Sequence, residues 1–281
     1  MPPPSPGTLY LVATPIGNLD DLSRRAETSL RDADRVLAED TRRTRALLTH
    51  LGIEKKPVER FDAHAGPGAI RQALEALGRG EALALVTDAG TPSVSDPGAA
   101  LARAAAEAGI RVVPVPGPSA VLAALAGAAL GDGAFRFLAF LPRDGAERDG
   151  ALERVTQTPE VVVLFESPHR VSATLKELAA LQPERPAVVA RELTKIHEEF
   201  TRGSLAELAL LDREWLGEVV LVLGPHEPPA RGASDEEVDR WIDEALGRGA
   251  SAKDAAQQVA ARSGRPRREV YARVLARRVQ G

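Results

Sequence analysis

Apolar and polar positions along the chain form two alternating kinds of block, one typical of strands and the other of helices. The short apolar runs predict buried strands over residues 9–13, 36–38, 58–61, 82–86 and 112–115. The stretches between them carry apolar residues three or four positions apart, and predict helices over residues 22–30, 44–51, 69–77 and 98–108. Strands that alternate with helices pair in parallel and are covered by helices on both faces. The predicted fold class is therefore α/β.

The same alternation resumes after residue 117 and predicts a second α/β domain. Its predicted strands cover residues 135–140, 161–165, 187–190 and 219–223. Its predicted helices cover residues 120–128, 152–156, 171–181 and 205–211. Between the two sets, the Pro-rich run at residues 114–119 stiffens and redirects the chain. We therefore place the two domains at residues 8–116 and 117–225.

The two ends of the chain differ from these domains. Residues 1–7 are Pro-rich and predict a disordered lead-in, without the basic and apolar segments of a signal peptide. Residues 226–233 predict a linker, and residues 234–281 a module of three short helices. Two of these helices begin with the spacing of a capping box, Ser234 with Glu237 and Ser251 with Asp254. No apolar run is long enough to span a membrane, which favours a cytoplasmic protein.

Charge is distributed unevenly along the chain. Residues 251–281 contain eight Lys or Arg and two Asp or Glu, a net charge of +6. The 281 residues together carry −4, so the part before residue 251 carries −10. A basic tail on an acidic body favours a polyanionic partner, although a solvated surface gives the same pattern. Three helices with a basic last helix likewise fit either a helix-turn-helix nucleic-acid reader or a packing and dimerisation module.

Two turns rich in small residues follow strands of the first predicted domain. The longer one covers residues 86–98, and its glycines would let a ligand approach the backbone closely. Ligands of open α/β sheets bind at the carboxyl ends of the strands. The alternative is a tight turn capped by Asp96, with Pro97 at the first helical position. The second turn, residues 116–120, should lie beside the first, and Ser119 is expected to cap the helix that follows.

The chemistry of these turns is limited by what the chain lacks. Neither turn has the Gly-x-Gly-x-x-Gly or Gly-Lys-Ser/Thr pattern of a nucleotide-binding loop, and no paired-histidine spacing indicates a metal site. The absence of cysteine excludes disulfides, thiolate zinc sites and a cysteine nucleophile. A small neutral cofactor bound largely through backbone groups fits the turns better.

Further polar residues follow other predicted strands. Glu39 and Arg42 come directly after one strand, where they could bind phosphate or position a hydroxyl. In the alternative interpretation, Asp40 caps a helix and the neighbouring arginines are solvated. Residues 191–199 form a second polar segment after a strand, for which surface charge is the alternative.

Taken together, these segments resemble a known family. Eight motifs occur in order: TPIGN at 14–18, EDTR at 39–42, DAGTP at 88–92 with SDPG at 95–98, PVPG at 114–117, FLAFLP at 137–142, FESPHR at 165–170, RELTK at 191–195 and GEVV at 217–220. They resemble the motifs of the ribosomal RNA small subunit methyltransferase I family, which has the tetrapyrrole methylase fold. Two departures are Ala65-Gly66, where the family usually shows Asn and Glu, and Pro118, where a small residue is common.

The resemblance implies a homodimer of chains with two α/β domains of the tetrapyrrole methylase type, a small C-terminal helical module and no metal. S-adenosylmethionine would lie in a cleft between the domains, and the reaction would be 2′-O-methylation of a cytidine in the decoding region of 16S ribosomal RNA. The residues implied for the cofactor are Asp88, Gly90, Thr91, Pro92, Val94, Ser119, Ala120 and Phe165. The arginines of the basic tail implied for RNA are Arg262, Arg265, Arg267, Arg268 and Arg273.

A ribose hydroxyl is a poor nucleophile, so its methylation needs in-line positioning and help in removing a proton. The candidates for these tasks are polar residues at predicted strand ends: Glu39, Arg42, Glu166, Arg191 and Lys195. Two alternatives remain open at this stage. One is a methyltransferase that acts on a tetrapyrrole or another small molecule, and the other is a non-catalytic RNA-binding assembly factor.

Overall fold

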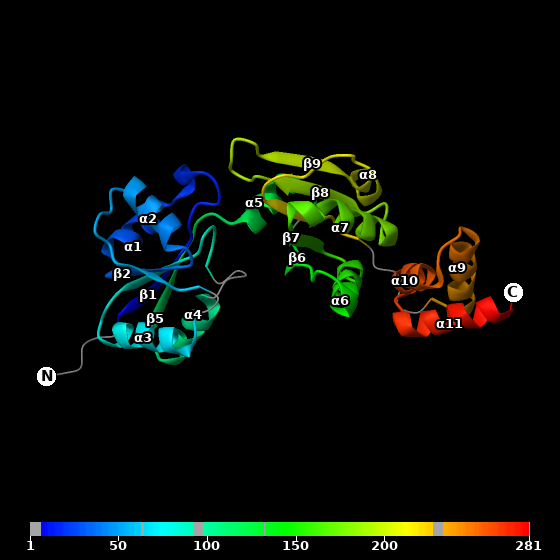
Figure 1. The fold of residues 1–281 in the computed structure, drawn as a ribbon, viewed down its shortest axis with the longest axis horizontal. Helices are drawn as coiled ribbons and strands as arrows, with labels where there is room; N and C mark the ends of the chain where they lie inside the picture. Colours follow the sequence, from blue (N-terminus) through cyan, green and yellow to red (C-terminus); the bar gives the residue numbers. More distant parts are fainter. Residues whose placement is uncertain (1–6, 63–64, 93–97, 132, 227–232, 281) are drawn as a thin grey trace. The chain divides into compact units, whose positions relative to one another are not determined.

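The computed structural model describes residues 7–62, 65–92, 98–131, 133–226 and 233–280 (Figure 1). For residues 278–280 it describes the backbone alone. The chain divides into two compact units. The first comprises Met1–Ala123 together with Leu193–Ile196, and the second comprises Ala124–Glu192 together with His197–Gly281. Most of the predicted lead-in and of the predicted linker lies outside the described residues, and the predicted domain limits stay predictions.

The N-terminal unit contains a five-stranded sheet with the strand order β3-β2-β4-β1-β5. Every neighbouring pair in it is parallel, as the sequence predicted. The strands are β1 (Thr8–Val12), β2 (Arg35–Ala38), β3 (Val58–Arg60), β4 (Leu83–Val86) and β5 (Arg111–Val115). The helices are η1 (Leu19–Asp21, 3₁₀), α1 (Arg24–Asp32), α2 (Thr41–His50), α3 (Pro67–Gly78) and α4 (Gly98–Glu107), and α5 (Ala120–Ala128) spans the division between the units.

Alternation along the strands explains why helices cover both faces of this sheet. In β2, Leu37 packs with α3 and α4, whereas its neighbours Val36 and Ala38 pack with α1 and α2. Successive side chains of a strand point to opposite faces, so both faces of an apolar strand are buried. Figure 1 shows α1 and α2 on one side of the sheet and α3 and α4 on the other. The three strands followed by candidate residues, β2, β4 and β5, therefore end at one edge of the sheet.

The second unit is built on a sheet of order β6-β7-β10-β8-β9. Only β6 and β7 pair in parallel, because β10 lies antiparallel between β7 and β8 and β9 is antiparallel to β8. The prediction of parallel pairing is therefore wrong for most of this sheet. The strands are β6 (Phe135–Phe140), β7 (Val161–Glu166), β8 (Pro186–Arg191), β9 (Glu199–Ser204) and β10 (Val219–Leu223). The helices α6 (Gly145–Thr156), α7 (Pro168–Leu181) and α8 (Leu205–Ala209) share one core with this sheet.

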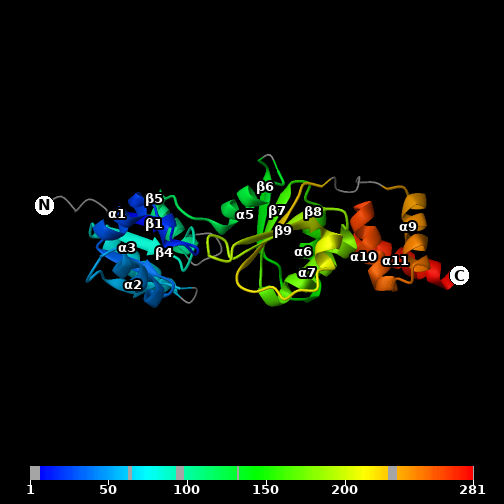
Figure 2. The same ribbon diagram turned by 90° about the horizontal axis from the view of Figure 1, so that it is seen from above.

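The chain ends in three helices, α9 (Asp235–Gly247), α10 (Ala252–Ser263) and α11 (Arg267–Gln280), which Figure 2 shows packed together. They enclose a core of their own that includes Val238, Ile242, Val259 and Val270. The predicted capping box at Ser234 is confirmed, since both of its hydrogen bonds are present. Within the described ranges, no helix is both long and apolar enough to cross a membrane.

Candidate functional site

The loops after β1 and β4 are joined at the carboxyl edge of the N-terminal sheet. Thr14 and Gly90 exchange two backbone hydrogen bonds, of 2.9 Å and 3.0 Å, and so form an isolated antiparallel bridge. The Thr14 hydroxyl also donates to the carbonyl of Thr87 over 3.2 Å. Gly90 has φ of +84°, a left-handed conformation that glycine adopts at little cost. Backbone hydrogen bonds therefore hold the loop after β1 and the loop after β4 together.

The two turns rich in small residues are neighbours, as predicted. The hydroxyl of Thr91, after β4, donates to the carbonyl of Pro118, after β5, over 3.1 Å. Behind them, a Cβ added to Gly117 would lie 2.9 Å from the Cβ of Ala13, so only glycine allows the β5 loop to pass this close to β1. Small residues thus line both turns and leave room for a ligand to approach the backbone, which suits a cofactor recognised through the backbone.

The remaining residues predicted for the cofactor are placed as follows. Pro92 is buried next to Thr91, and Ser119 begins α5 by accepting a hydrogen bond from the N–H of Leu122 over 3.4 Å, the predicted capping role. Ala120 is the first residue of α5. Val94 lies outside the described residues. Phe165 belongs to the C-terminal unit, where its ring meets Phe137 edge-on with ring centres 4.9 Å apart.

Glu39 is the carboxylate that this edge holds in place. Its Oε2 accepts the hydroxyl of Thr87 over 3.0 Å and the N–H of Asp88 over 3.4 Å. In the part of the chain that the structure describes, its Oε1 has no hydrogen-bond partner, and the side chain is only partly buried. One oxygen is therefore anchored while the other is available to a ligand. Thr87 was not singled out in the sequence, although it stands between a buried strand and Asp88.

Asp40 and the two arginines after it organise the start of α2. Asp40 caps the helix through the N–H of Arg42 at 2.8 Å, so the capping alternative is confirmed for this residue. Hydrogen bonds from the side chain and then the backbone N–H of Arg42 lower the pKa of Asp40 to about 2. The Arg42 side chain is 88% exposed, while Arg43 approaches Asp88 Oδ2 at 3.6 Å. The guanidinium of Arg42, three positions after Glu39, is therefore exposed and also bound to Asp40 at 3.0 Å.

Lys195 belongs to the segment Leu193–Ile196, which forms part of the N-terminal unit. This segment lies against Gly17 in the loop after β1. A Cβ added to Gly17 would lie 2.8 Å from Thr194 Oγ1 and 3.0 Å from the carbonyl oxygen of Leu193, and it would clash with Cγ of Lys195. Thr194 itself has φ of +66°, which is strained for a β-branched residue. Such strain persists only where the surroundings impose it, and it gathers at functional sites.

Arg191 and Glu166 lie in the C-terminal unit, and both have partners there. Arg191 Nε is 2.7 Å from Glu199 Oε2, and Arg213 binds the same carboxylate at 2.6 Å; these bonds hold the pKa of Glu199 well below its usual range. The Glu166 side chain is 1% exposed and accepts bonds from the N–H of Ser167 at 2.8 Å and the Thr174 hydroxyl at 2.7 Å. Glu166, a candidate for substrate positioning or proton handling, uses both of its oxygens in hydrogen bonds to α7 and to the residue before it.

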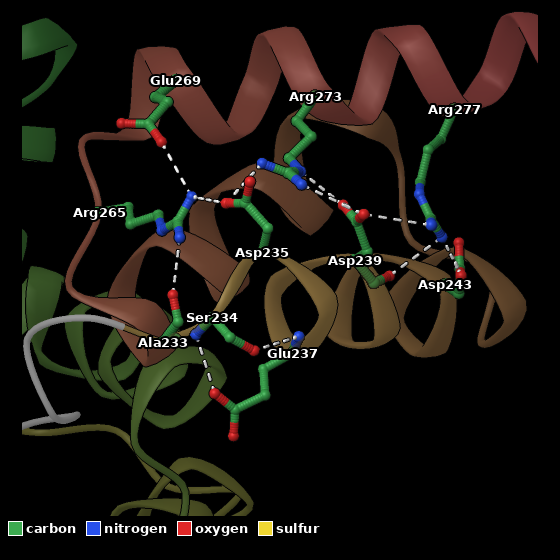
Figure 3. Close-up of polar contacts among 10 residues, drawn as sticks. All are labelled: Ala233, Ser234, Asp235, Glu237, Asp239, Asp243, Arg265, Glu269, Arg273 and Arg277. Atoms are coloured by element: carbon green, nitrogen blue, oxygen red, sulfur yellow. Dashed lines mark hydrogen bonds and ion pairs between the residues drawn. The ribbon is translucent and has the colours of Figure 1, made fainter.

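Four of the five arginines expected to bind RNA are paired with carboxylates of the protein. Arg265 and Arg273 both reach Asp235, over 2.5 Å and 2.9 Å (Figure 3). Arg267 binds Asp149 at 2.7 Å. Arg262 lies 4.1 Å above the ring of Trp241 and 3.5 Å from Glu244. Arg268 is exposed and has no ion pair with any residue that the structure describes.

Comparison with known families identifies the fold. Residues 8–209 match the family model described as tetrapyrrole (corrin/porphyrin) methylases, and residues 232–278 match the model described as the RsmI C-terminal HTH domain. The chain belongs to the tetrapyrrole methylase family. This membership confirms the predicted fold class and the predicted class of enzyme, a methyltransferase.

Curated relatives match nearly the whole chain. The ribosomal RNA small subunit methyltransferase I of Xylella fastidiosa is 43% identical, covering 95% of this chain and 98% of the relative. That of Halalkalibacterium halodurans is 38% identical, covering 94% and 93%. These matches confirm the resemblance seen in the motifs.

Solved structures share the fold at low identity. Uroporphyrin-III C-methyl transferase from Thermus thermophilus, complexed with S-adenyl homocysteine, has a TM-score of 0.56 at 22% identity, covering 78% of this chain and 97% of that one. A diphthine synthase has a TM-score of 0.58 at 18% identity, covering 78% and 92%. Among the described residues, no group of three or more His, Asp or Glu could hold a metal ion.

Proposed function

We propose that the protein is an S-adenosylmethionine-dependent methyltransferase that acts on the small-subunit ribosomal RNA. The observation that carries this proposal is 43% identity, over nearly the whole chain, to a relative named ribosomal RNA small subunit methyltransferase I. The acceptor we propose is the 2′-hydroxyl of a cytidine in the decoding region of 16S RNA, because the motifs of the chain resemble those of the family with that activity. A homodimer in the cytoplasm completes the proposal.

The two joined turns of the N-terminal unit fit the cofactor. When bound, S-adenosylmethionine supplies a methyl group activated by the adjacent sulfonium charge. Backbone groups of Thr91, Ser119 and Ala120 would hold it beside Gly90, whose own N–H and C=O bind Thr14, since these positions carry small or short side chains at the carboxyl edge of the sheet. We keep Asp88 and Pro92 as residues that shape this pocket, and Val94 and Phe165 as further contacts.

Glu39 is our candidate for the proton of the ribose hydroxyl. Thr87 and the Asp88 N–H fix one carboxylate oxygen, which leaves Oε1 to accept a hydrogen bond from the substrate. The Glu39 carboxylate would accept the proton that the hydroxyl oxygen loses on methylation, which is a form of general base catalysis. Holding the hydroxyl in line with the methyl group contributes to the rate at the same time.

Arg42 and Lys195 are our candidates for positioning the RNA. The Arg42 guanidinium is 88% exposed although Asp40 binds one side of it at 3.0 Å, so its solvent side would meet a phosphate near the reacting ribose. Lys195 is held against the loop after β1 by the contact of its segment with Gly17. Arg191 remains a candidate only as support for the end of β8, since Glu199 holds its guanidinium.

The test is methyl transfer from labelled S-adenosylmethionine to small ribosomal subunits that lack the modification, followed by nuclease digestion and nucleoside analysis. We expect the label in 2′-O-methylcytidine. Label in another nucleoside would change the acceptor, and label in ribosomal protein would refute an RNA substrate. No transfer, with cofactor binding intact, would favour a tetrapyrrole or another small molecule, or an assembly factor without activity.

A further inference from the structure

The last helix, α11, uses one of its sides to hold the C-terminal module together. Val270 and Val274 on this side are buried in the module core. Beside them, Arg273 reaches Asp239 at 2.5 Å and Asp235 at 2.9 Å. Arg277 reaches Asp243 and, over 3.3 Å, Asp239. Figure 3 shows both arginines extending from α11 to this row of carboxylates on α9.

We call this arrangement the α9–α11 ladder. It pairs the two arginines with carboxylates of the same module: Arg273 and Arg277 with Asp235, Asp239 and Asp243. The three aspartates are four positions apart, so they lie one above the other on α9. Hydrogen bonds to Asp239 and Asp235 raise the pKa of Arg273, and the bond from Arg273 lowers the pKa of Asp239. An RNA phosphate would have to displace a carboxylate that is already in place. The ladder therefore orients α11 and leaves these guanidinium groups few N–H donors with which to bind an RNA phosphate.

The opposite side of α11 is uncovered and has a different character. Arg268, Tyr271 and Leu275 are spaced three and four positions apart, which places them on one face of the helix. Tyr271 is 40% exposed and Leu275 is 43% exposed. Arg268 is exposed as well, and nothing in the described part of the chain forms an ion pair with it. The neighbouring Ala272 is exposed and short, so a ligand can approach the backbone between these side chains.

We propose that this face of α11, made of Arg268, Tyr271 and Leu275, contacts the RNA substrate. Tyr271 would stack on an unstacked base, and Arg268 would meet a neighbouring phosphate. The argument rests on the proposed function, because it takes RNA to be the substrate. An exposed aromatic ring beside an uncommitted cation matches the base and the phosphate that every nucleotide presents together. A protein partner would have to provide a carboxylate for Arg268 at the same position.

The proposal is tested with the full chain and a labelled transcript of the 16S decoding region, by filter binding over a range of NaCl concentrations. Tyr271→Ala should weaken binding about fivefold to a hundredfold, as expected when one stacked base is lost. Arg268→Ala should lower the slope of log affinity against log salt by about one. Arg240→Ala removes an exposed arginine of α9 that has no ion pair with a described residue, and should leave both quantities unchanged.

Tyr271→Gln provides a second variant that keeps a residue well suited to a helix, and it should show the same loss. Unchanged RNA affinity in the Tyr271 and Arg268 variants, alongside normal methyl transfer by the wild type, would overturn this inference and leave the proposed function standing. A change in oligomeric mass with unchanged RNA affinity would assign the face to a second copy of the chain and would also overturn it. If the wild type neither binds the transcript nor methylates small subunits, both proposals fail.

Discussion

The hydroxyl of Thr87 donates a hydrogen bond to Glu39 Oε2 over 3.0 Å and so joins the ends of the neighbouring strands β2 and β4. We predict that Glu39→Gln lowers kcat for methyl transfer by about a hundredfold or more, because an amide cannot accept the ribose proton. The affinity for S-adenosylmethionine should stay unchanged, since the backbone of the two turns is not altered. Single-turnover transfer and calorimetric titration of the cofactor measure the two effects separately.

Glu54→Gln is the matched control for this variant, because Glu54 is exposed and follows α2 at a distance from the strand ends. It should retain full activity. Thr87→Val removes the bond that orients Glu39 but keeps the carboxylate, so its kcat should fall less than that of Glu39→Gln. If Glu39→Gln retained wild-type kcat, proton removal by Glu39 would be wrong.

The contact between Gly17 and the segment Leu193–Ile196 leads to a second prediction. A Cβ at position 17 would lie 3.0 Å from the carbonyl of Leu193, a backbone atom that cannot move aside cheaply. Gly17→Ala should therefore displace Lys195 and raise KM for the RNA substrate. Gly78→Ala is the control, since a Cβ there meets nothing within 4 Å. Equal KM values for the two variants would show that the position of Lys195 does not matter to the substrate.

The sequence predicted the N-terminal sheet well because both faces of its strands are apolar. In β2, Val36, Leu37 and Ala38 are all buried, so the strand appears as a continuous apolar run. The strand β9 was not predicted, because it lies at a sheet edge and carries polar residues such as Glu199 and Arg202. Antiparallel pairing of β10 was also missed, since the order of elements along the chain does not determine the position of a strand in the sheet.

The candidate site was predicted in part, for a similar reason. Glu39 could be found because it follows a buried strand directly, and Thr91 because it lies in the loop of small residues after β4. Thr87 and Gly17 gain their importance from partners far along the chain, Glu39 and Leu193, and no local pattern indicates such contacts. The ion pairs of the basic tail could not be predicted from local patterns either, because Asp235, which binds Arg265, lies thirty positions away. Net charge along the sequence therefore overstated how much positive charge is available to RNA.

The hydrogen bond from Thr91 to the carbonyl of Pro118 marks where the cofactor is expected to bind. Thr91→Arg places a long charged side chain between the two turns and should weaken S-adenosylmethionine binding at least about tenfold, a change of 1.4 kcal/mol. Thr28→Arg adds the same side chain on the exposed surface of α1 and should have no effect. Calorimetric titration compares the three proteins. Wild-type affinity in Thr91→Arg would show that the pocket has been placed wrongly.

The ladder between α9 and α11 should make the C-terminal module sensitive to acid. Bonds from Arg273 and Arg265 lower the pKa values of Asp239 and Asp235 below that of aspartate in an unfolded chain, about 3.9. A carboxylate with a lowered pKa stabilises the folded state fully above its unfolded pKa, and the effect disappears as the pH falls through the folded pKa. We therefore expect the melting temperature of the module, followed through the indole NMR signal of Trp241, to be level near neutral pH and to fall below about pH 4.

Asp239→Asn should reduce this pH dependence. It should destabilise the module by only on the order of 1 kcal/mol at neutral pH, because these ion pairs are partly exposed. Glu236→Gln, on the same helix but outside the ladder, is the control, and a wild-type module whose stability does not change down to pH 2 would contradict the assignment.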